Sequence, residues 1–322
     1  MNSAVADLSK FLSVSTDGDE PGILSFGDPT DEYRALRDSV GILWLSDQRA
    51  YRICGSERTE FLQRLLTGDI KGIAAGSCSM SLLLDNKGRA QVALEIGALA
   101  NELIAVGATP QVDVGMETLA RYVLRSDVQI EPLDSVALAL IGPTADELIR
   151  GAQIDALERP PMAFRSAWGW LLVADAPVVA WKRLIAAGAV PVGRDAAETL
   201  RIEARQPQCG NEITGAEFPQ ELRLEAAIDF DKGCYLGQET VARIHYRGQV
   251  NRLLCVLRCD GGLQVGDTLR AKGKDIGQVT SMINVVGSDT VALGFVARGH
   301  SDIGARLTTS ANVSVTVVEA AP

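Results

Sequence analysis

Apolar positions recur every three or four residues in some segments of the first 250 residues and every second residue in others. The first spacing places side chains on one face of a helix, and the second is typical of a half-buried strand. One helix is predicted where Phe61, Leu62, Leu65 and Leu66 share a face, and Ser56 is a residue type that caps such a helix. Further helices are predicted over 31–40, around 116–123, and over 144–150, 178–187 and 195–203.

Alternating or short apolar runs predict strands over 44–53, 78–84, 89–96, 103–106, 136–141 and 168–174. The sequence Asp85-Asn86-Lys87-Gly88 is typical of a hairpin turn between the second and third of these. Short strands joined by hairpins and mixed with helices indicate the α+β class and argue against a doubly wound parallel sheet. No GxGxxG follows a strand and no Walker loop is present, so the sequence gives little support to nucleotide binding.

Near residue 250 the pattern changes to short β-like runs separated by glycine-rich turns. Five strands are predicted, over 253–257, 268–270, 276–282, 291–297 and 313–318. Five short strands without a clear helix indicate a small β-barrel. We therefore predict one region over 1–249, containing two α+β units whose segments can alternate along the sequence, and a barrel domain over 250–322. The polar stretch before about residue 29 is expected to be a loose lead-in.

The composition is that of a folded protein, with 47% hydrophobic and 22% charged residues among 322. The net charge of −10 makes direct nucleic-acid binding unlikely, although it does not exclude a local basic pocket. No apolar run is long enough to cross a bilayer, and the first twelve residues do not resemble a secretory signal. Six scattered cysteines and only two histidines favour a cytoplasmic protein without a zinc site.

The segment most suggestive of chemistry runs from 229 to 243 and contains a single cysteine, Cys234. We expect Cys234 to lie just before or at the start of a helix, where backbone N–H groups and the nearby Lys232 favour a thiolate. Gly233 and Gly237 allow a sharp turn and the close approach of a ligand. The alternative is that Cys234 is a small buried residue, as many free cysteines are.

Residues 232–239, KGCYLGQE, resemble the K-G-C-Y-x-G-Q-E signature of the YgfZ-type folate-binding proteins. Further segments similar to that family lie at 33–41, 61–70, 200–213 and 245–252. The resemblance implies the fold of the glycine-cleavage T-protein: a ring of two α+β units, a small C-terminal barrel and a tetrahydrofolate site in the central channel. It also implies a role in the assembly or repair of iron–sulfur clusters.

Two departures from the T-protein pattern stand out. The T-protein carries a catalytic aspartate shortly after its Gly-Gly turn, and the corresponding positions here are about Val92 and Ala93, which cannot transfer a proton. The T-protein also lacks the cysteine of the KGCY segment. A further departure, from the pattern of the YgfZ-type family itself, is Arg205, which replaces the glycine usual after the R-I-E segment. The loop after Glu203 is therefore expected to differ, because a bulky residue disfavours positive φ.

The resemblance assigns candidate ligand contacts. Glu203 matches the glutamate that binds the pterin ring, and a carboxylate can accept two hydrogen bonds from its amino-pyrimidine edge. Arg243 and Arg247 are candidates to pair with the glutamate tail of folate, or are ordinary surface residues. The remaining candidate ligand contacts are Arg201, Tyr235 and Gln238, and the candidate reactive groups are Cys234 and Lys232.

Three functions remain open from the sequence. The first is a tetrahydrofolate-binding protein that acts through Cys234 on iron–sulfur client or scaffold proteins. The second is a tetrahydrofolate-dependent aminomethyltransferase or demethylase of a small amine, which would need a proton-transferring carboxylate near residues 92–93. The third is an accessory protein of tRNA modification that acts indirectly, without contacting nucleic acid or a membrane.

Overall fold

The computed structural model describes residues 23–284 and 289–321, and the chain divides into two compact units. Unit 1 comprises the described residues up to Leu83 together with 92–197, and unit 2 comprises 84–91 and the chain from Glu198 onward. Most of the predicted lead-in lies outside the described residues. A membrane-spanning helix, which needs a long and nearly uncharged apolar stretch, does not occur in the described ranges.

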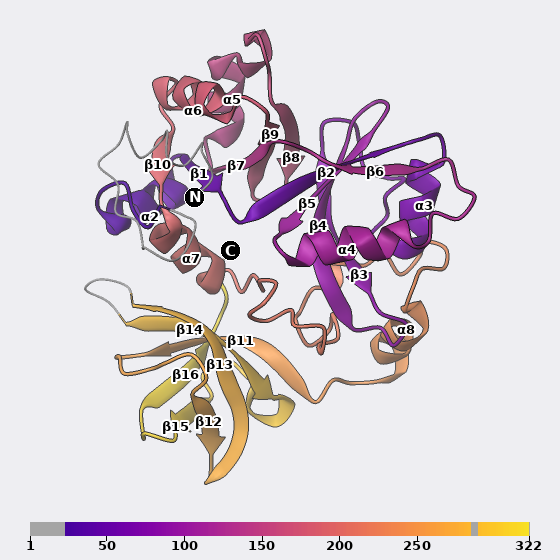
Figure 1. The fold of residues 1–322 in the computed structure, drawn as a ribbon. Coiled ribbons are helices and arrows are strands. Elements are labelled where there is room, and N and C mark those ends of the chain that lie inside the picture. Colours follow the sequence, from indigo (N-terminus) through magenta and orange to yellow (C-terminus); the bar gives the residue numbers. More distant parts are fainter. Residues whose placement is uncertain (1–22, 285–288, 322) are drawn as a thin grey trace. The chain divides into compact units, whose positions relative to one another are not determined.

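The first sheet of unit 1 has five strands (Figure 1). In spatial order these are β10 (Val190–Val192), β1 (Gly41–Leu45), β7 (Val136–Ile141), β9 (Gly169–Ala174) and β8 (Met162–Ser166). Neighbours pair antiparallel except β1 and β10, which are parallel. Of these strands, β7 and β9 coincide with predicted ones, whereas β8 and β10 were not predicted.

The second sheet also has five strands. In spatial order these are β3 (Cys78–Leu84), β4 (Ala90–Ala98), β5 (Leu103–Ala108), β2 (Gln48–Cys54) and β6 (Gln129–Pro132). The single strand predicted over 44–53 is wrong, because the chain turns at Ser46 and Asp47 and passes from β1 in the first sheet to β2 in the second. Serine and aspartate are favoured in such turns because their side chains bond to nearby backbone.

Helices lie close to where the periodicity predicts them, although the one predicted over 116–123 begins at Gln111 and ends at Ala120. They are α2 (Pro29–Asp38), α3 (Arg58–Leu65), α4 (Gln111–Ala120), α5 (Ala145–Ala152), α6 (Pro177–Ala186) and α7 (Arg194–Glu203). The predicted cap Ser56 is wrong: Glu57 occupies that position, and the Ser56 hydroxyl bonds to Asp127 at 2.7 Å instead. Two short 3-10 turns complete the chain up to residue 227, η1 (Ile154–Ala156) and η2 (Glu225–Ala227).

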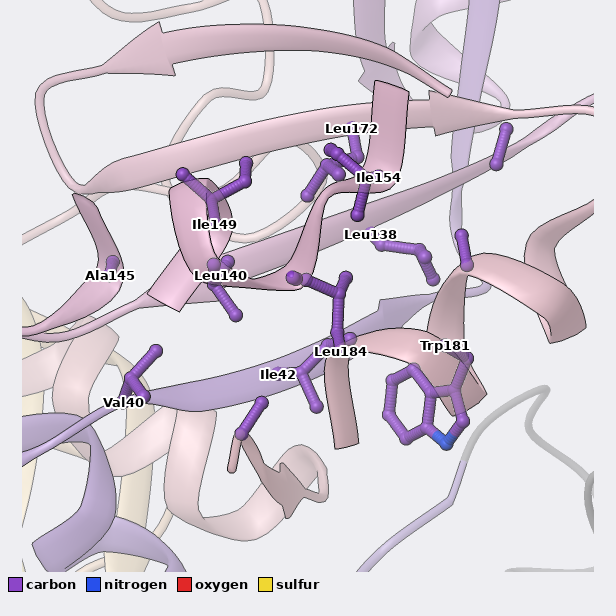
Figure 2. Packing of buried hydrophobic residues seen from close by; sticks show 14 of the residues in the cluster. Val40, Ile42, Leu138, Leu140, Ala145, Ile149, Ile154, Leu172, Trp181 and Leu184 are labelled. Atoms are coloured by element: carbon purple, nitrogen blue, oxygen red, sulfur yellow. The ribbon is translucent and has the colours of Figure 1, made fainter. Parts of the chain in front are cut away.

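The first sheet packs its apolar face against α5 and α6 (Figure 2). Trp181 and Leu184 of α6 meet Ile42 of β1 and Leu138 of β7, and all four side chains are almost fully buried. A fully buried side chain of this size contributes about 1.5–3 kcal/mol. The core of this half of unit 1 is therefore formed by the inward-facing apolar residues of β1 and β7 together with the apolar face of α6.

A second cluster fills the space between the two sheets of unit 1. It contains Ala50, Ile104 and Val106 from the second sheet and Phe164 and Leu171 from the first. A Cβ atom added at Gly97 of β4 would lie 2.7 Å from the Phe164 ring, so the glycine makes room for this aromatic side chain. The face of β4 that carries Gly97 therefore points towards the first sheet.

Unit 2 contains a closed six-stranded barrel, so the predicted α+β fold with a C-terminal barrel is confirmed. Its strands are β11 (Arg252–Cys259), β12 (Thr268–Ala271), β13 (Lys274–Asn284), β14 (Thr290–Ala297), β15 (Arg306–Thr309) and β16 (Ser314–Val318). The sixth strand, β15, was not predicted. Buried side chains of these strands, including Cys255 and Cys259, fill the barrel. The short turn η3 (Arg298–His300) follows β14.

Candidate functional site

The KGCYLGQE segment lies in unit 2 and begins with a turn stabilised by Asp229. The Asp229 carboxylate accepts hydrogen bonds from the backbone N–H groups of Asp231 at 2.8 Å and Lys232 at 3.0 Å. Such a local side-chain bond fixes a turn without regular secondary structure. The turn thereby fixes the path of the chain as it enters the segment around Cys234.

All six cysteines lie in the described part of the chain, and Cys234 alone is exposed. Helix α8 (Gln238–Arg247) begins four residues after it, with Gly237 at the N-cap. Cys234 therefore precedes the helix, as predicted, but does not lie in its first turn. Cys255 and Cys259 are buried in the barrel, where they pack against its other apolar side chains. In the described residues, no three His, Cys, Asp or Glu side chains are placed to hold a metal ion.

Gly237 packs closely against the hairpin turn within residues 84–91, which also belong to unit 2. Its φ is +80°, and an added Cβ would lie 2.5 Å from the carbonyl oxygen of Asp85. The turn of that hairpin is itself fixed by the Asp85 carboxylate, which accepts from the backbone N–H groups of Lys87 and Arg89 at 2.8 Å. Only glycine satisfies both the backbone conformation and the close approach at position 237.

We expect Gly237→Ala to lower the free energy of unfolding by about 2 kcal/mol or more, through left-handed strain and the clash with Asp85. Gly233→Ala is the matched control, since an added Cβ at Gly233 meets nothing within 4 Å and its φ is not positive. Urea denaturation of both variants tests this. Equal stability of the two variants would contradict the assigned contact.

Tyr235 is the buried residue of the segment, with 6% of its surface exposed. Its hydroxyl has no hydrogen-bond partner among the described residues. Burial, followed by the charge of Asp229, raises the pKa of the Tyr235 hydroxyl to about 12, so the group stays protonated and can donate a hydrogen bond. The ammonium of Lys232 lies 5.4 Å from the centre of the Tyr235 ring.

The predicted contacts on α8 are mostly exposed. Gln238 is the first helical residue and is partly buried, while Arg243 and Arg247 are exposed one turn apart. His245 is also exposed and stacks on Phe230, with ring centres 3.9 Å apart.

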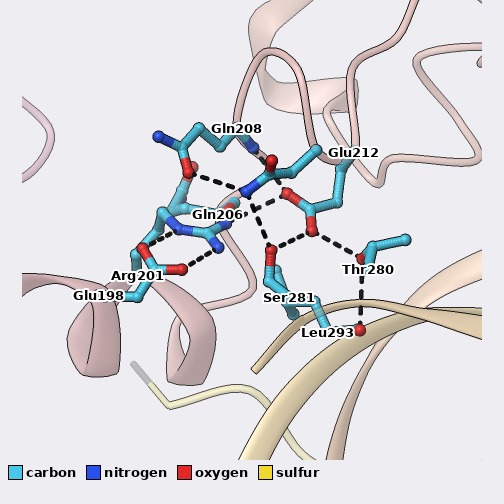
Figure 3. A network of polar contacts seen from close by, with 9 residues as sticks. Glu198, Arg201, Gln206, Gln208, Glu212, Thr280, Ser281 and Leu293 are labelled. Carbon is cyan, nitrogen blue, oxygen red and sulfur yellow. Dashed lines mark hydrogen bonds and ion pairs between the residues drawn. The ribbon is translucent and has the colours of Figure 1, made fainter. Parts of the chain in front are cut away.

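The other predicted contacts lie at the end of α7. Glu203 is the last residue of that helix and is partly buried, and its backbone carbonyl accepts from the Ala321 N–H at 2.7 Å. Arg201 has an exposed side-chain fraction of 15% and is engaged within unit 2 (Figure 3). Its guanidinium donates to Glu198 at 2.5 and 2.7 Å, to the Gln206 carbonyl at 2.6 Å and to Glu212 at 3.2 Å. Four of the five N–H donors of an arginine are thus used, which leaves one for a ligand.

Glu212 is the centre of this network and is fully buried (Figure 3). One carboxylate oxygen accepts from the Gln208 N–H at 3.0 Å as well as from Arg201. The other accepts from Thr280 at 2.7 Å and Ser281 at 2.6 Å, both on β13. The network therefore fastens the loop after α7 to the barrel within unit 2.

The loop after α7 contains a residue with left-handed backbone. The φ angle at Arg205 is +53°. The expectation that Arg205 alters its loop by avoiding positive φ is therefore wrong: the left-handed conformation is present with an arginine in it.

In unit 1, β4 places a carboxyl group that the sequence reasoning missed. Val92 is buried and Ala93 is partly buried, and neither aliphatic side chain carries a group that can transfer a proton. Glu95 lies two residues further on, on the same strand face as Ala93 and Gly97. In a strand of alternating residues a glutamate is normally read as solvent-facing, and a single sequence gives no signal against that reading.

Glu95 faces an apolar environment. It pairs across the sheet with Val106, which belongs to the cluster between the two sheets, and Cys78 of β3 packs against the same cluster. Burial raises the pKa of Glu95 to about 7, while a hydrogen bond with Cys78 opposes this. Burial likewise raises the pKa of the Cys78 thiol, and the neighbouring Glu95 adds to that effect.

Comparisons with known proteins agree with this architecture. Residues 25–180 match the GCVT N-terminal domain family. A putative chloroplastic transferase of Arabidopsis thaliana is 25% identical over 93% of this chain and 75% of its own length. An aminomethyltransferase of Halalkalibacterium halodurans is 25% identical over 87% of this chain and 85% of its own. Together these matches support a relationship to the T-protein family.

The fold is also that of a solved structure. The glycine cleavage system aminomethyltransferase T of Bartonella henselae superposes with a TM-score of 0.85 over 98% of this chain and 96% of its own, at 21% identity. An uncharacterized protein of Haemophilus influenzae is 24% identical over 76% of this chain and 84% of its own length. The T-protein-like fold predicted from the sequence is confirmed.

Proposed function

We propose that this is a cytoplasmic tetrahydrofolate-binding protein of the YgfZ type that supports the assembly or repair of iron–sulfur clusters. The observation that carries the proposal is Cys234, the one exposed cysteine, at the centre of a KGCYLGQE segment in a T-protein-like fold. The side chains at Val92 and Ala93 carry no carboxyl group at the aligned catalytic positions. Both features favour a binding protein with a reactive thiol over an aminomethyltransferase.

The candidate residues carry polar groups that suit a ligand whose aromatic ring has several hydrogen-bonding groups. The Tyr235 hydroxyl is buried without a partner among the described residues, and such a group is stabilised when a ligand accepts its hydrogen bond. Glu203 offers a partly buried carboxylate, which suits the amino-pyrimidine edge of a pterin. Arg243 and Arg247 offer exposed guanidinium groups for the carboxylates of a glutamate tail.

In this function the Cys234 thiol would contact an iron–sulfur client or scaffold protein, since an exposed sulfur on a surface loop is accessible to a second protein. The protein partners are iron–sulfur proteins, and no direct contact with nucleic acid or a membrane is proposed.

Calorimetric titration with tetrahydrofolate, combined with alkylation of Cys234, tests the proposal. We expect saturable binding to the wild type, weaker binding to Glu203→Ala, and rapid alkylation that is lost in Cys234→Ser. Cys54→Ser is the matched control, because Cys54 is partly buried and should not determine the alkylation rate. Absence of tetrahydrofolate binding together with an unreactive Cys234 would refute the proposal.

A second candidate is a tetrahydrofolate-dependent transferase or demethylase of a small amine, and Glu95 favours it. A general acid or base works best when its pKa is near the ambient pH, and burial gives Glu95 such a pKa. Formation of methylene-tetrahydrofolate from an aminomethyl donor, whose carbon is already at the oxidation level of the methylene group and which releases its amine nitrogen as ammonia, lost in Glu95→Gln, would establish this activity. No turnover by the wild type would exclude it.

A further inference from the structure

Helix α4 of unit 1 (Figure 1) has one packed face and one exposed face. Val112, Met116 and Leu119 are buried on the packed face. A Cβ atom added at Gly115 would lie 3.1 Å from the Val92 side chain on β4, so this face lies close against the second sheet. The opposite face of α4 is therefore the part of the helix that can contact another molecule.

Exposed apolar side chains gather on α4 and the turns that follow it. Val114 has 59% of its surface exposed, Tyr122 45% and Leu124 86%. The described residues contain eight exposed large apolar side chains, and three of them lie in this one segment. The turns are held by backbone hydrogen bonds, such as the one from the Tyr122 N–H to the Leu119 carbonyl at 2.9 Å. Such a concentration of exposed apolar side chains indicates a contact surface.

Two opposite charges lie between Val114 and Leu124. Glu117 and Arg121 are both exposed, and helical spacing places them on the same side of α4 as Val114. Neither forms an ion pair within the described part of the chain, whereas the nearby Asp113 pairs with Arg49 at 2.6 Å. Glu117 and Arg121 are therefore available to pair with charges on a second molecule.

Val114, Glu117, Arg121 and Leu124, called the α4 stripe below, are arranged symmetrically about Leu119. The two apolar residues each lie five positions from Leu119, and the two charged residues each lie two positions from it. Two copies of the stripe can pack antiparallel across a two-fold axis beside Leu119. Val114 of each copy then faces Leu124 of the other, and Glu117 of each faces Arg121 of the other. Such an isologous interface makes every contact twice.

We propose that the α4 stripe is a self-association surface, whose partner is a second copy of this chain in antiparallel orientation. The four charges then alternate in sign around the two-fold axis, so each is next to two opposite charges. Thr118 and Ala120 lie on either side of Leu119, and their small side chains let the two helices approach closely. The proposal concerns a surface of unit 1 and does not depend on the function proposed above.

The association is expected to be weak and concentration-dependent. One helix face offers less than the roughly 800 Å² per partner that stable complexes bury, so we expect a dissociation constant on the order of 100 μM. At the protein concentrations of about 1 μM that suit denaturation experiments, the chain is then a monomer. Salt is expected to weaken the association further, because the charges lie on an exposed surface.

Sedimentation velocity of the full chain between about 5 and 500 μM, a range that spans this dissociation constant, tests the surface. We expect the wild type to shift from monomer towards dimer as its concentration rises. Leu124→Ser should weaken the association by about tenfold, through the loss of apolar burial. Ile303→Ser is the matched control, because Ile303 is also an exposed apolar residue, with 68% of its surface exposed, and lies outside the stripe in unit 2. It should associate like the wild type.

A charge exchange tests the two-fold arrangement itself. Glu117→Arg places four positive charges around the axis and Arg121→Glu places four negative ones, so each single variant should lose the association. The double variant with both changes restores the alternation and should associate like the wild type. Because both positions are exposed, circular dichroism should show the same fold throughout. A wild type that stays monomeric over the whole range, a dimer that Leu124→Ser leaves unchanged, or a double variant that does not regain the association would overturn the proposal.

Discussion

Glu212→Ala is expected to lower the free energy of unfolding by about 3 kcal/mol or more, because it removes a fully buried carboxylate with four hydrogen-bond partners. The hydroxyl group of Ser281 and the Gln208 N–H would be left without their acceptor, and the Thr280 hydroxyl would keep only the Leu293 carbonyl at 3.3 Å. Arg201 would keep its bonds to Glu198, which limits the loss. Urea denaturation followed by circular dichroism measures the effect.

Ser281→Ala serves as the control for this prediction, since it removes a single neutral donor to Glu212. Its expected cost is about 1–2 kcal/mol. If Glu212→Ala cost no more than Ser281→Ala, the network around Glu212 would not be the fastening between the α7 loop and the barrel.

Glu95→Gln is expected to stabilise the protein at pH 8 and to leave its stability at pH 4 nearly unchanged. The pKa of Glu95 is about 7 in the folded protein, above its ordinary value of 4.5, because burial disfavours the charged form. Below pH 4.5 the group is neutral in both the folded and the unfolded state. As the pH rises through 7, the Glu95 carboxyl group is already ionised in the unfolded state. Ionising it in the folded state costs free energy, so the wild type becomes less stable. The rise of the Glu95 pKa from 4.5 to about 7 corresponds to a loss of about 3 kcal/mol in the free energy of unfolding of the wild type at high pH.

The measurement is the free energy of unfolding of wild type and Glu95→Gln at several pH values between 4 and 8. Glu117→Gln is the matched control, because Glu117 is exposed on α4 in the same unit and its replacement makes the same change in charge without altering a buried carboxyl group. A constant difference between wild type and Glu95→Gln across this range would show that Glu95 does not titrate near neutrality.

Periodicity predicted the regular elements well where it extended over several turns or alternations. The apolar positions of α3, for example, are buried as expected, and β3 and β7 have the predicted bounds. It failed where an element was short, as in β10 and β15, and where one apolar run crossed from one sheet to another, as at Ser46. Short strands are formed by their pairing partners, which a local pattern does not contain.

The candidate site was predicted in part. The exposed position of Cys234 ahead of α8 and the location of Glu203 at a helix end agree with the sequence reasoning. The sequence does not predict the full network around Arg201 and Glu212. Thr280 and Ser281 complete that network from a strand about 70 residues away from Glu212. The burial of Glu95, on the second sheet, depends in the same way on the first sheet that packs over it.

The most direct test of the central claim is a crystal structure of the protein with tetrahydrofolate bound. The proposed function predicts the pterin ring hydrogen-bonded to the Glu203 carboxylate, with the Tyr235 hydroxyl paired and the Cys234 thiol still accessible. A folate bound elsewhere, with Glu203 and Tyr235 unchanged, would contradict it.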